Sequence, residues 1–540
     1  MRIAALDLGS NSFHLLVVET RPDGSFTALV REKAMLRLGD VVASNGVLTE
    51  EALDAAVEVV GRFRAIAETN AADEVLAYGT AALREAANGA AAVERLETET
   101  GVRVKVITGI REAQLIFEAV RASVLIDPGP ALCADLGGGS LELSVGGRTG
   151  LLYATSLHLG VGRLTAELVR SDPPTGKDRG RLRARVEEEL AVVLTEIVDE
   201  SPRQLIGSSG TFCAIVRASA ALRDGVVPPV VNQLSVSSKE VAEFADLVFS
   251  LSSADRIRLP GIDSRRAELM PAGVTVAEVL MEETGFLELT ASEWALREGM
   301  VLSAIRKHDR ADLTGDPRAI RRASVLSLCR RSSWREAHGK VAAELACQLF
   351  EATSSVHHLG PQDLELLELA ALLHDIGDHV SRDGHGRHTA YLIENGGLRG
   401  FSPDEVSMLS CLGRYHTRGR PRESFPAWDS LSSRERSRCL SLLSLLRIAD
   451  GLDVAHASLV FGIDANVGPE TVELVVQCRG DAELELWMFQ RKKALFEELF
   501  VRKLTLRIVS AGHDEFVAAA SKGTHDGRRA GDRPVGRATG

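Results

Sequence analysis

The chain has 540 residues, of which 45% are hydrophobic and 26% are charged. This balance is typical of folded globular proteins and excludes a chain that is disordered throughout. At about 150 residues per domain, the length predicts three or four domains. The net charge of −12 disfavours non-specific binding to nucleic acid or to an anionic bilayer, so we expect no nucleic-acid partner.

The seven cysteines are scattered and never spaced C-x-x-C. This argues against a disulfide framework or a cysteine-based zinc site and favours a reducing compartment. The N-terminal sequence MRIAALDLGS has an acidic residue at position 7 and no apolar h-region of a signal peptide. No uncharged apolar run approaches the roughly 18 residues of a membrane span. We therefore expect a cytoplasmic protein without integral membrane association.

Strand-like and helix-like segments alternate through the first third of the chain. Apolar runs at Ile3–Leu6 and His14–Val18 predict strands around a polar turn, and Leu53–Ala67 repeats its apolar residues at helical spacing. The alternation continues through predicted strands at Val75–Tyr78 and Val102–Ile107 and a predicted helix at Glu112–Val124. It favours an α/β layered domain.

Two distant segments share one plan, in which an apolar strand is followed by Asp-Leu-Gly, two small or polar residues, Ser and a second strand. They are IAALDLGSNSFHLLV at the start and ALCADLGGGSLELSV from Ala131. The aligned pairs are Asp7 with Asp135, Gly9 with Gly137, and Ser12 with Ser140. The repeat favours two similar domains that face one cleft, although segments this short also match by chance.

These turns carry the residue types of a phosphate site. A carboxylate at the end of a buried strand is costly unless it meets a metal, water or donor. The glycines that follow let backbone N–H groups approach an anion closely. One such turn alone is an ordinary tight turn. Two aligned copies, together with a third glycine loop at Gly207–Thr211, favour a phosphate cleft.

The second half of the chain has a different pattern. A helix predicted over Ala291–Arg306 closes the first half. Long helical segments then predict an all-α domain, at Ala319–Leu328, His338–Thr353, Asp363–Leu373, Pro403–Tyr415 and Ser437–Leu452. Predicted strands at Val472–Gln477 and Leu504–Val509 flank a helical Leu486–Val501, and the last twenty residues have the composition of a disordered tail.

Six motifs occur in the order DLGSNSFHLLV, GTAALREAAN, ITGIREAQLIFEAV, DLGGGSLEL, GSSGT and ALREGM. Together they resemble the exopolyphosphatase/guanosine pentaphosphate phosphatase (Ppx/GppA) family of the actin-like ATPase superfamily, whose members often carry a helical C-terminal half of the HD type. The resemblance implies an α/β fold of two actin-like (ribonuclease-H-like) domains around a cleft, then an all-α HD-type domain and a small α+β subdomain. The expected bounds are 1–127, 128–310, 311–462 and 463–512, with a disordered tail at 513–540. The resemblance also implies a homodimer.

The activity that this resemblance implies is hydrolysis of a terminal phosphoanhydride by an activated water. Glu112 aligns with the family's catalytic glutamate, and Asp135 and Glu142 match positions that hold Mg2+, with Asp7 as a further candidate ligand. On the residues alone, Glu112 is a carboxylate that favours a helix N-terminus. On the same basis, Glu142 is an ordinary exposed residue of a strand in which apolar and polar side chains alternate.

The remaining matched residues would hold the phosphates. They are Ser10, Asn11, Ser12, Arg84, Gly137, Gly138, Gly139, Ser140, Ser209, Gly210 and Thr211. Such chemistry is mostly positioning and charge neutralisation and needs no covalent nucleophile. The chain departs from the family at Arg111, where a second acidic residue is usual, and at Leu141, where threonine is common. Both departures leave the substrate preference open.

The helical half carries its own candidate metal site. His338, the pair His374-Asp375, and Asp450 follow the order H…HD…D, which resembles HD-superfamily metal phosphohydrolases. Imidazole and carboxylate together suit a second divalent metal, and His388 and His416 lie in segments that would extend the site. The alternative is that these side chains only pack and hydrogen-bond inside a helical bundle.

We therefore predict an exopolyphosphatase that hydrolyses inorganic polyphosphate with Mg2+ and releases orthophosphate. The alternative within the family is a guanosine pentaphosphate 5′-phosphohydrolase. An HD-type nucleotide phosphohydrolase with a sensory actin-like half, a non-enzymatic phosphate-binding scaffold and a kinase are further alternatives.

Overall fold

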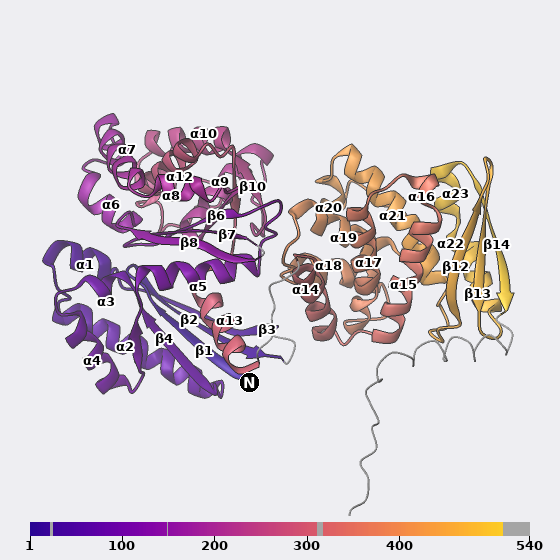
Figure 1. The fold of residues 1–540 in the computed structure, drawn as a ribbon, viewed down its shortest axis with the longest axis horizontal. Coiled ribbons are helices and arrows are strands. Elements are labelled where there is room, and N and C mark those ends of the chain that lie inside the picture. The colour runs from indigo at the N-terminus through magenta and orange to yellow at the C-terminus, as the bar shows by residue number, and fades with distance from the viewer. Residues whose placement is uncertain (22–24, 148, 310–316, 511–540) are drawn as a thin grey trace, which may run out of the picture. The chain divides into compact units, whose positions relative to one another are not determined.

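The computed structural model describes residues 1–21, 25–147, 149–309 and 317–510 (Figure 1). The chain forms two compact units. The first comprises Met1–Arg331 with Ile393–Ser407, and the second comprises Ser332–Leu392 and the chain from Met408. The predicted disordered tail at 513–540 lies outside the described residues, and the domain bounds within each unit stay predictions.

The first unit begins with a five-stranded sheet of order β3-β2-β1-β4-β5. Its strands are β1 (Arg2–Leu8), β2 (Ser12–Thr20), β3 (Phe26–Met35), β4 (Glu74–Gly79) and β5 (Val104–Val106). Strand β1 pairs antiparallel with β2 and parallel with β4. Helices α1 (Leu38–Asn45), α2 (Glu50–Thr69), α3 (Ala81–Glu85) and α4 (Gly89–Thr100) accompany this sheet.

A six-stranded sheet of order β10-β11-β9-β6-β7-β8 follows. Its strands are β6 (Ala131–Leu136), β7 (Leu141–Gly147), β8 (Gly150–Leu157), β9 (Gln204–Ser208), β10 (Ser235–Ser237) and β11 (Glu288–Ala291). Strand β6 pairs antiparallel with β7 and parallel with β9, as β1 does with β2 and β4. The shared pairing confirms the duplication that the two Asp-Leu-Gly segments predict.

Seven helices accompany the second sheet, and all of them except the short α11 contribute residues to one large apolar core. They are α6 (Val161–Leu168), α7 (Gly176–Ala191), α8 (Leu194–Asp199), α9 (Ser209–Asp224), α10 (Ser238–Ser250), α11 (Ser253–Arg256) and α12 (Met270–Thr284).

Two helices, α5 (Gly109–Arg121) and α13 (Leu296–Asp309), lie between the two sheets (Figure 1). Their apolar side chains form one buried cluster with Ile3 and Ala5 of β1 and Ala131 and Cys133 of β6. The alternate residues of β1 face the other way, into the core that α2 covers. Both sheets therefore fix the position of α5, the helix that carries Glu112.

In the first unit, three predicted elements differ from the structure. The helix predicted over Ala291–Arg306 is wrong at its start, because Ala291 ends β11 and α13 begins at Leu296. The helix predicted over Glu112–Val124 begins earlier, at Gly109, because the Thr108 hydroxyl caps it by accepting a hydrogen bond from the Arg111 N–H. The strand predicted over Val102–Ile107 is confined to β5.

The second unit is mainly helical, as predicted. Its helices include α15 (Glu336–Ala352), α16 (Ser354–His357), α17 (Pro361–Leu373), α20 (Pro426–Asp429) and α21 (Ser433–Gly451), with a 3-10 turn at Ile376–His379. Helices α18 (His385–Asn395) and α19 (Pro403–Tyr415) cross the division between the units, and α14 (Pro317–Arg331) belongs to the first.

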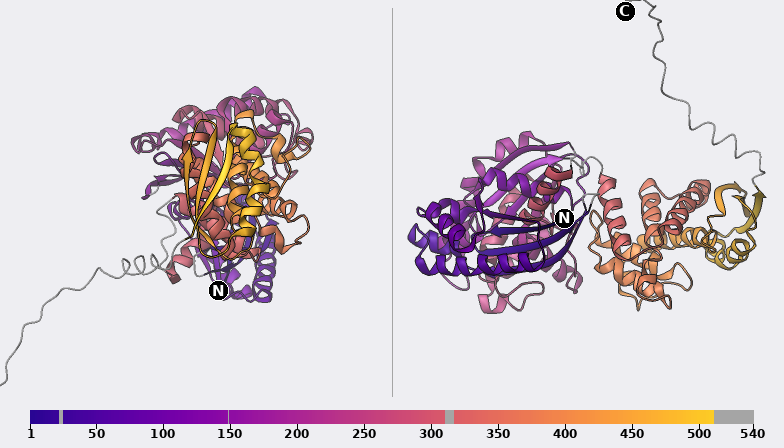
Figure 2. Two further views of the ribbon diagram at one scale, coloured as in Figure 1. Left: turned by 90° about the vertical axis from the view of Figure 1, so that its right-hand side faces the viewer. Right: turned by 90° about the horizontal axis from the view of Figure 1, so that it is seen from below.

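A three-stranded sheet of order β12-β13-β14 ends the described chain (Figure 2). Strands β13 (Thr471–Cys478) and β14 (Lys503–Ser510) match the two predicted strands, and β12 (Val460–Val467) was not predicted. The predicted helix between the strands is divided into α22 (Glu483–Lys492) and α23 (Ala494–Phe500). None of the seven cysteines, all of which lie in the described ranges, forms a disulfide. No helix in these ranges has the length and apolar character to cross a membrane.

Gly299 offers a test of the packing between α13 and α5. A Cβ at this position would lie 2.0 Å from the Leu115 carbonyl oxygen, so any side chain must push the two helices apart. We expect Gly299→Ala to lower the free energy of unfolding by about 1–3 kcal/mol, as overpacking does. Chemical denaturation measures the change.

The matched control is Gly61→Ala in the middle of α2, where a Cβ would meet nothing within 4 Å. Alanine forms helix better than glycine, so this variant should gain up to about 1 kcal/mol. Equal effects of the two variants would contradict the packing argument.

Candidate functional site

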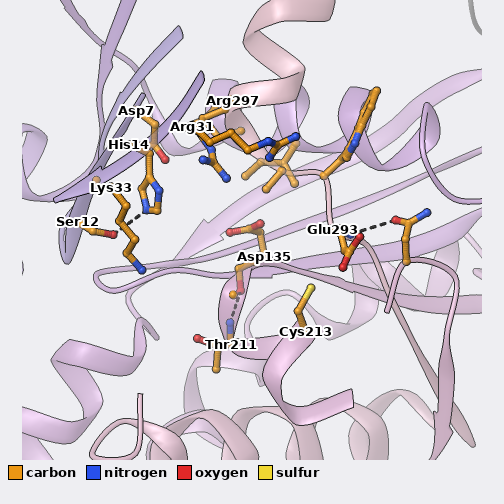
Figure 3. A pocket seen from close by; sticks show the side chains of 18 of the residues that line it. Asp7, Ser12, His14, Arg31, Lys33, Asp135, Thr211, Cys213, Glu293 and Arg297 are labelled. Carbon is orange, nitrogen blue, oxygen red and sulfur yellow. Dashed lines mark hydrogen bonds between the residues drawn. The ribbon is translucent and has the colours of Figure 1, made fainter. Parts of the chain in front are cut away.

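A polar cavity of about 840 Å3 lies in the first unit, where β1 and β6 end (Figure 3). It is lined by every residue predicted for the phosphate and Mg2+ site except Arg84 and Glu142. These lining residues are Asp7, Ser10, Asn11, Ser12, Glu112, Asp135, Gly137, Gly138, Gly139, Ser140, Ser209, Gly210 and Thr211. The structure therefore brings together residues that are far apart in the sequence.

The two Asp-Leu-Gly turns lie against each other. A Cβ on Gly138 would lie 2.4 Å from Cγ of Asn11, so glycine lets the turns approach this closely. The carbonyl oxygens of Gly137 and Gly138 accept hydrogen bonds of 3.0 Å from the N–H groups of Val161 and Gly162 in α6. Because the carbonyl and N–H of a trans peptide point in opposite directions, the next N–H groups, of Gly138 and Gly139, are directed away from α6. They are available to a phosphate oxygen.

Asp7 and Asp135 hold equivalent places at the ends of their strands but have different surroundings. The Ser208 hydroxyl donates a hydrogen bond of 2.5 Å to Oδ2 of Asp135. Burial raises the pKa of Asp135 to about 6, against the effects of Ser208 and Arg297. Burial, aided by the negative charge of Asp135, raises the pKa of Asp7 to about 7. Figure 3 shows both aspartates beside the same cavity.

Glu112 lies in the first turn of α5, where the helix dipole favours a negative charge. Nη1 of Arg84 lies 3.2 Å from Oε2 of Glu112 and donates a hydrogen bond of 2.8 Å to the Ile107 carbonyl. Burial and the neighbouring charge of Glu142 raise the pKa of Glu112 well above its usual range, and Arg84 opposes them. Arg84 thus contacts the candidate general base and does not line the cavity, although the resemblance places it near the anion.

Glu142 is buried in β7, beside the cavity and outside its lining. The Ser156 hydroxyl donates a hydrogen bond of 2.8 Å to its Oε1. Burial raises the pKa of Glu142 to about 7, and the charge of Asp135 contributes to the rise. The carboxyl groups of Asp7, Glu112, Asp135 and Glu142 are thus electrostatically linked.

This set of carboxyl groups fits a hard divalent cation. Each group has a raised pKa, and a neighbouring carboxyl group contributes to the rise at Asp7, Glu112 and Glu142. A bound Mg2+ would favour their ionised forms, and oxygen is the ligand type that it prefers. Mg2+ at Asp135 and Glu142, with Asp7 as a further ligand, stays a prediction.

Basic side chains form much of the remaining lining, and sequence reasoning missed them. They are Arg31, Lys33, Arg217, Arg265, Arg266, Arg297, Arg331 and Arg399. Burial and the nearby arginines lower the pKa of Lys33 to about 8. Figure 3 shows Arg31, Lys33 and Arg297 around the same space as the two aspartates. The only sequence signal for any of them was the ALREGM motif, which contains Arg297.

The four predicted HD-type residues also come together, within the second unit. Nε2 of His338 lies 3.7 Å from Oδ1 of Asp450 and 3.8 Å from Oδ2 of Asp375. Nε2 of His374 lies at the same two distances from these oxygens. The other oxygen of Asp450 pairs with Lys492.

Imidazole nitrogens and carboxylate oxygens that converge in this way fit a divalent transition metal. His416 joins the cluster as predicted, but His388 does not. His385, one turn earlier in α18, lies beside Asp375 instead. Among the described residues, every group of three or more potential metal ligands within 4.8 Å of one another lies in this unit.

Comparison with known proteins agrees with the fold and the cavity. Residues 17–308 match the Ppx/GppA phosphatase family, and residues 320–458 match its domain III. Exopolyphosphatase 1 of Mycobacterium leprae is 35% identical over 303 residues, which cover 56% of this chain and 89% of that protein.

Two solved structures are similar to slightly more than half of the chain. An exopolyphosphatase from Cytophaga hutchinsonii has a TM-score of 0.53 and 29% identity, over 57% of this chain and 98% of that one. The Aquifex aeolicus member of the Ppx/GppA family has a TM-score of 0.50 and 28% identity, over 57% and 99% of the two chains. The repeated actin-like sheets, the cavity between their Asp-Leu-Gly turns and a family match over more than half of the sequence show that this chain belongs to the Ppx/GppA phosphatase family.

Proposed function

We propose that this protein is an exopolyphosphatase, which hydrolyses the terminal phosphoanhydride of inorganic polyphosphate and releases orthophosphate. The observation that carries the proposal is one cavity that combines Glu112 and the glycine turns with a lining rich in arginine and lysine. A relative named exopolyphosphatase 1 matches this chain over 89% of its own length.

The reaction requires a water to attack the terminal phosphorus while the bond to the bridging oxygen breaks. Glu112 accepts the proton of this water, and burial raises its pKa above the usual carboxyl range, which makes its ionised form a stronger base. The N–H groups of Gly138 and Gly139, with the hydroxyls of Ser10, Ser12 and Thr211, hold the terminal phosphate. The leaving group is the polyphosphate shortened by one unit. Mg2+ held by Asp135 and Glu142 would neutralise phosphate charge.

The lining favours a chain of phosphates over a nucleotide. The basic lining also includes Arg331 of α14 and Arg399 of the segment between α18 and α19. The aromatic rings of the lining are already in contact, because Phe26 stacks on Trp294 at 5.0 Å and Arg399 lies over Trp294 at 4.7 Å. A guanine base would have to displace the stack of Phe26 on Trp294, whereas polyphosphate binds through cations and needs no aromatic ring. Guanosine pentaphosphate stays the alternative substrate.

The helical unit supports a second part of the proposal. We infer that this unit is of the HD type and that His338, His374, Asp375 and Asp450 bind one divalent transition metal, in addition to Mg2+ in the first unit. The convergence of their ligand atoms supports this. The small C-terminal sheet as a separate subdomain, a homodimeric assembly and a cytoplasmic location are parts of the same proposal.

The variant Glu112→Gln tests whether the hydrolysis takes place in the first unit. We expect orthophosphate release from long-chain polyphosphate, measured with Mg2+, to fall by about 10²–10⁴-fold, because the amide accepts no proton. The double variant His374→Ala/Asp375→Ala is the control and should keep the activity. Loss only in the control would mean that the helical unit performs the hydrolysis. The same assay with guanosine pentaphosphate decides between the two substrates.

The pH dependence tests the role of Arg84. The positive charge of Arg84 lowers the pKa of Glu112, so Arg84→Leu should raise this pKa further. The fraction of ionised base then falls, and the acidic limb of the kcat/KM profile should move to higher pH. Arg84→Lys keeps the charge and should move the limb less. An unchanged limb in Arg84→Leu would contradict the role of Glu112 as general base.

Variants of Arg331 and Arg399 test whether the cavity binds long-chain polyphosphate more tightly than a short chain. A hydrogen bond to a charged group contributes about 1.5 kcal/mol or more, so Arg331→Gln and Arg399→Gln should each raise KM for long-chain polyphosphate about tenfold. The KM for triphosphate should change little, since a short chain ends nearer Glu112. Arg103→Gln changes an exposed arginine outside the cavity and serves as control. Equal losses on both chain lengths would argue against an extended binding path.

A further inference from the structure

One arginine of α6 holds the turn that connects β6 and β7. Nε of Arg163 donates a hydrogen bond of 3.2 Å to the Gly139 carbonyl oxygen, and the backbone N–H of Arg163 donates one of 3.2 Å to the Gly138 carbonyl oxygen. Gly138 and Gly139 line both the main cavity and a second, small pocket, whereas Arg163 lines only the small one. Arg163 therefore contacts two consecutive peptides of the phosphate turn from outside the main cavity.

The side chain of Arg163 sets the direction of one further N–H group. The carbonyl and N–H of a trans peptide point in opposite directions, so the bond to the Gly139 carbonyl directs the N–H of Ser140 away from Arg163. Ser140 lines the main cavity, so its N–H can join those of Gly138 and Gly139 as a phosphate donor. A cationic partner on the carbonyl also polarises the peptide and strengthens its N–H as a donor.

Glu85 keeps the guanidinium of Arg163 in this place. Nη2 of Arg163 pairs with Oε2 of Glu85, the last residue of α3, and the two side chains are 24% and 22% exposed. An ion pair that is largely buried is screened less than one on the surface. The planar guanidinium of Arg163 thus engages Glu85 and Gly139 at the same time, which a lysine ammonium on a flexible stem does less well.

Close packing limits how far the turn can adjust by itself. A Cβ on Gly139 would lie 2.8 Å from Oγ of Ser10 and 3.0 Å from Cβ of Ala81, the first residue of α3. A Cβ on Gly160, just before α6, would lie 2.2 Å from the carbonyl carbon of Gly139. The turn is therefore confined between α3, which accompanies the first sheet, and the start of α6, which accompanies the second.

Consecutive residues of α3 reach the two sides of the reaction. Arg84 lies 3.2 Å from Glu112, the candidate general base. Glu85 reaches the phosphate turn through Arg163. One short helix thus relates the base to the phosphate donors, and a misplacement of about 1 Å between reacting groups can cost about 10²-fold in rate.

We propose that Arg163 and Glu85 are positioning residues for phosphoanhydride hydrolysis. Arg163 directs the N–H of Ser140 toward the terminal phosphate. Glu85 keeps Arg163 on the turn, while Arg84 beside it keeps Glu112 in place. The proposal rests on the function proposed above and adds the contacts that align the phosphate donors with the general base.

The variant Arg163→Met keeps the length of the side chain and removes its donors. We expect kcat on long-chain polyphosphate to fall by about 10–100-fold, less than the loss of a whole oxyanion donor at its upper limit. KM should change little, because the basic lining still binds the rest of the chain. The acidic limb of the pH profile should stay in place, since Glu112 keeps Arg84. A fall in activity through KM alone, or none, would contradict the proposal.

Two further variants separate positioning from folding. Arg163→Lys keeps the charge and one donor, so it should restore part of the lost kcat. Arg183→Met removes a partly exposed, ion-paired arginine of α7 outside the cavity and should keep the wild-type kcat. Equal losses in Arg163→Met and Arg183→Met would mean that any broken ion pair has this effect, and the proposal would be wrong.

A double variant tests whether Glu85 acts through Arg163. We expect Glu85→Gln to lower kcat less than Arg163→Met does. Glu85→Gln/Arg163→Met should then match Arg163→Met, because the effects of residues that act through one contact do not add. Additive losses would overturn the role of Glu85.

Binding of inorganic phosphate distinguishes this proposal from the proposed function, because it requires no turnover. In calorimetric titrations of the full chain, the Kd of orthophosphate should rise about tenfold in Arg163→Met, the effect of one lost hydrogen bond to a charged group. It should stay unchanged in Arg183→Met. If the wild type hydrolyses no polyphosphate but this rise is observed, only the exopolyphosphatase proposal fails. Equal phosphate binding by the wild type and Arg163→Met would overturn the role of Arg163.

Discussion

The cost of burying carboxyl groups beside one another is the constraint on which the catalytic half depends. The charge of Glu142 raises the pKa of Glu112, and the charge of Asp135 raises the pKa values of Asp7 and Glu142. The fold offsets this cost with Arg84 on Glu112, Ser208 on Asp135 and the helix dipole of α5. The Mg2+ proposed for this site would offset more of the cost, because it would favour the ionised forms of these carboxyl groups.

The duplication explains where Asp7 and Asp135 lie, but it does not explain why their surroundings differ. The equivalent pairing of β1 and β6 puts Asp7 and Asp135 at matching strand ends. Yet only Asp135 has a serine hydroxyl as partner, because its neighbouring strand β9 ends in Ser208. Glu112 lies outside the two aligned segments, on α5, which packs between both sheets. Two similar domains thus form one asymmetric site.

The sequence predicted those parts of the candidate sites that are carried by short, contiguous motifs. The Asp-Leu-Gly turns, the Gly207–Thr211 loop and the His374-Asp375 pair are short motifs, and the structure puts them where ligands could bind. The cationic lining was missed because its residues, from Arg31 to Arg399, are scattered along the chain and meet only after folding. His385 and His388 are one helical turn apart, so their spacing in the sequence does not show which of them lies beside Asp375. In the structure it is His385, the first residue of α18.

The two units differ in the donors that they offer a metal. The first offers carboxylate oxygens, which suit a hard ion that keeps its waters and exchanges with substrate. The second offers imidazoles whose Nδ1 atoms already have hydrogen-bond partners, an arrangement that suits a softer ion held by the protein itself. Because ligand type separates the two classes, the Mg2+ proposed for the first unit and the transition metal proposed for the second would be loaded independently. On this proposal, the transition-metal content of the second unit would not determine the rate of phosphate release in the first.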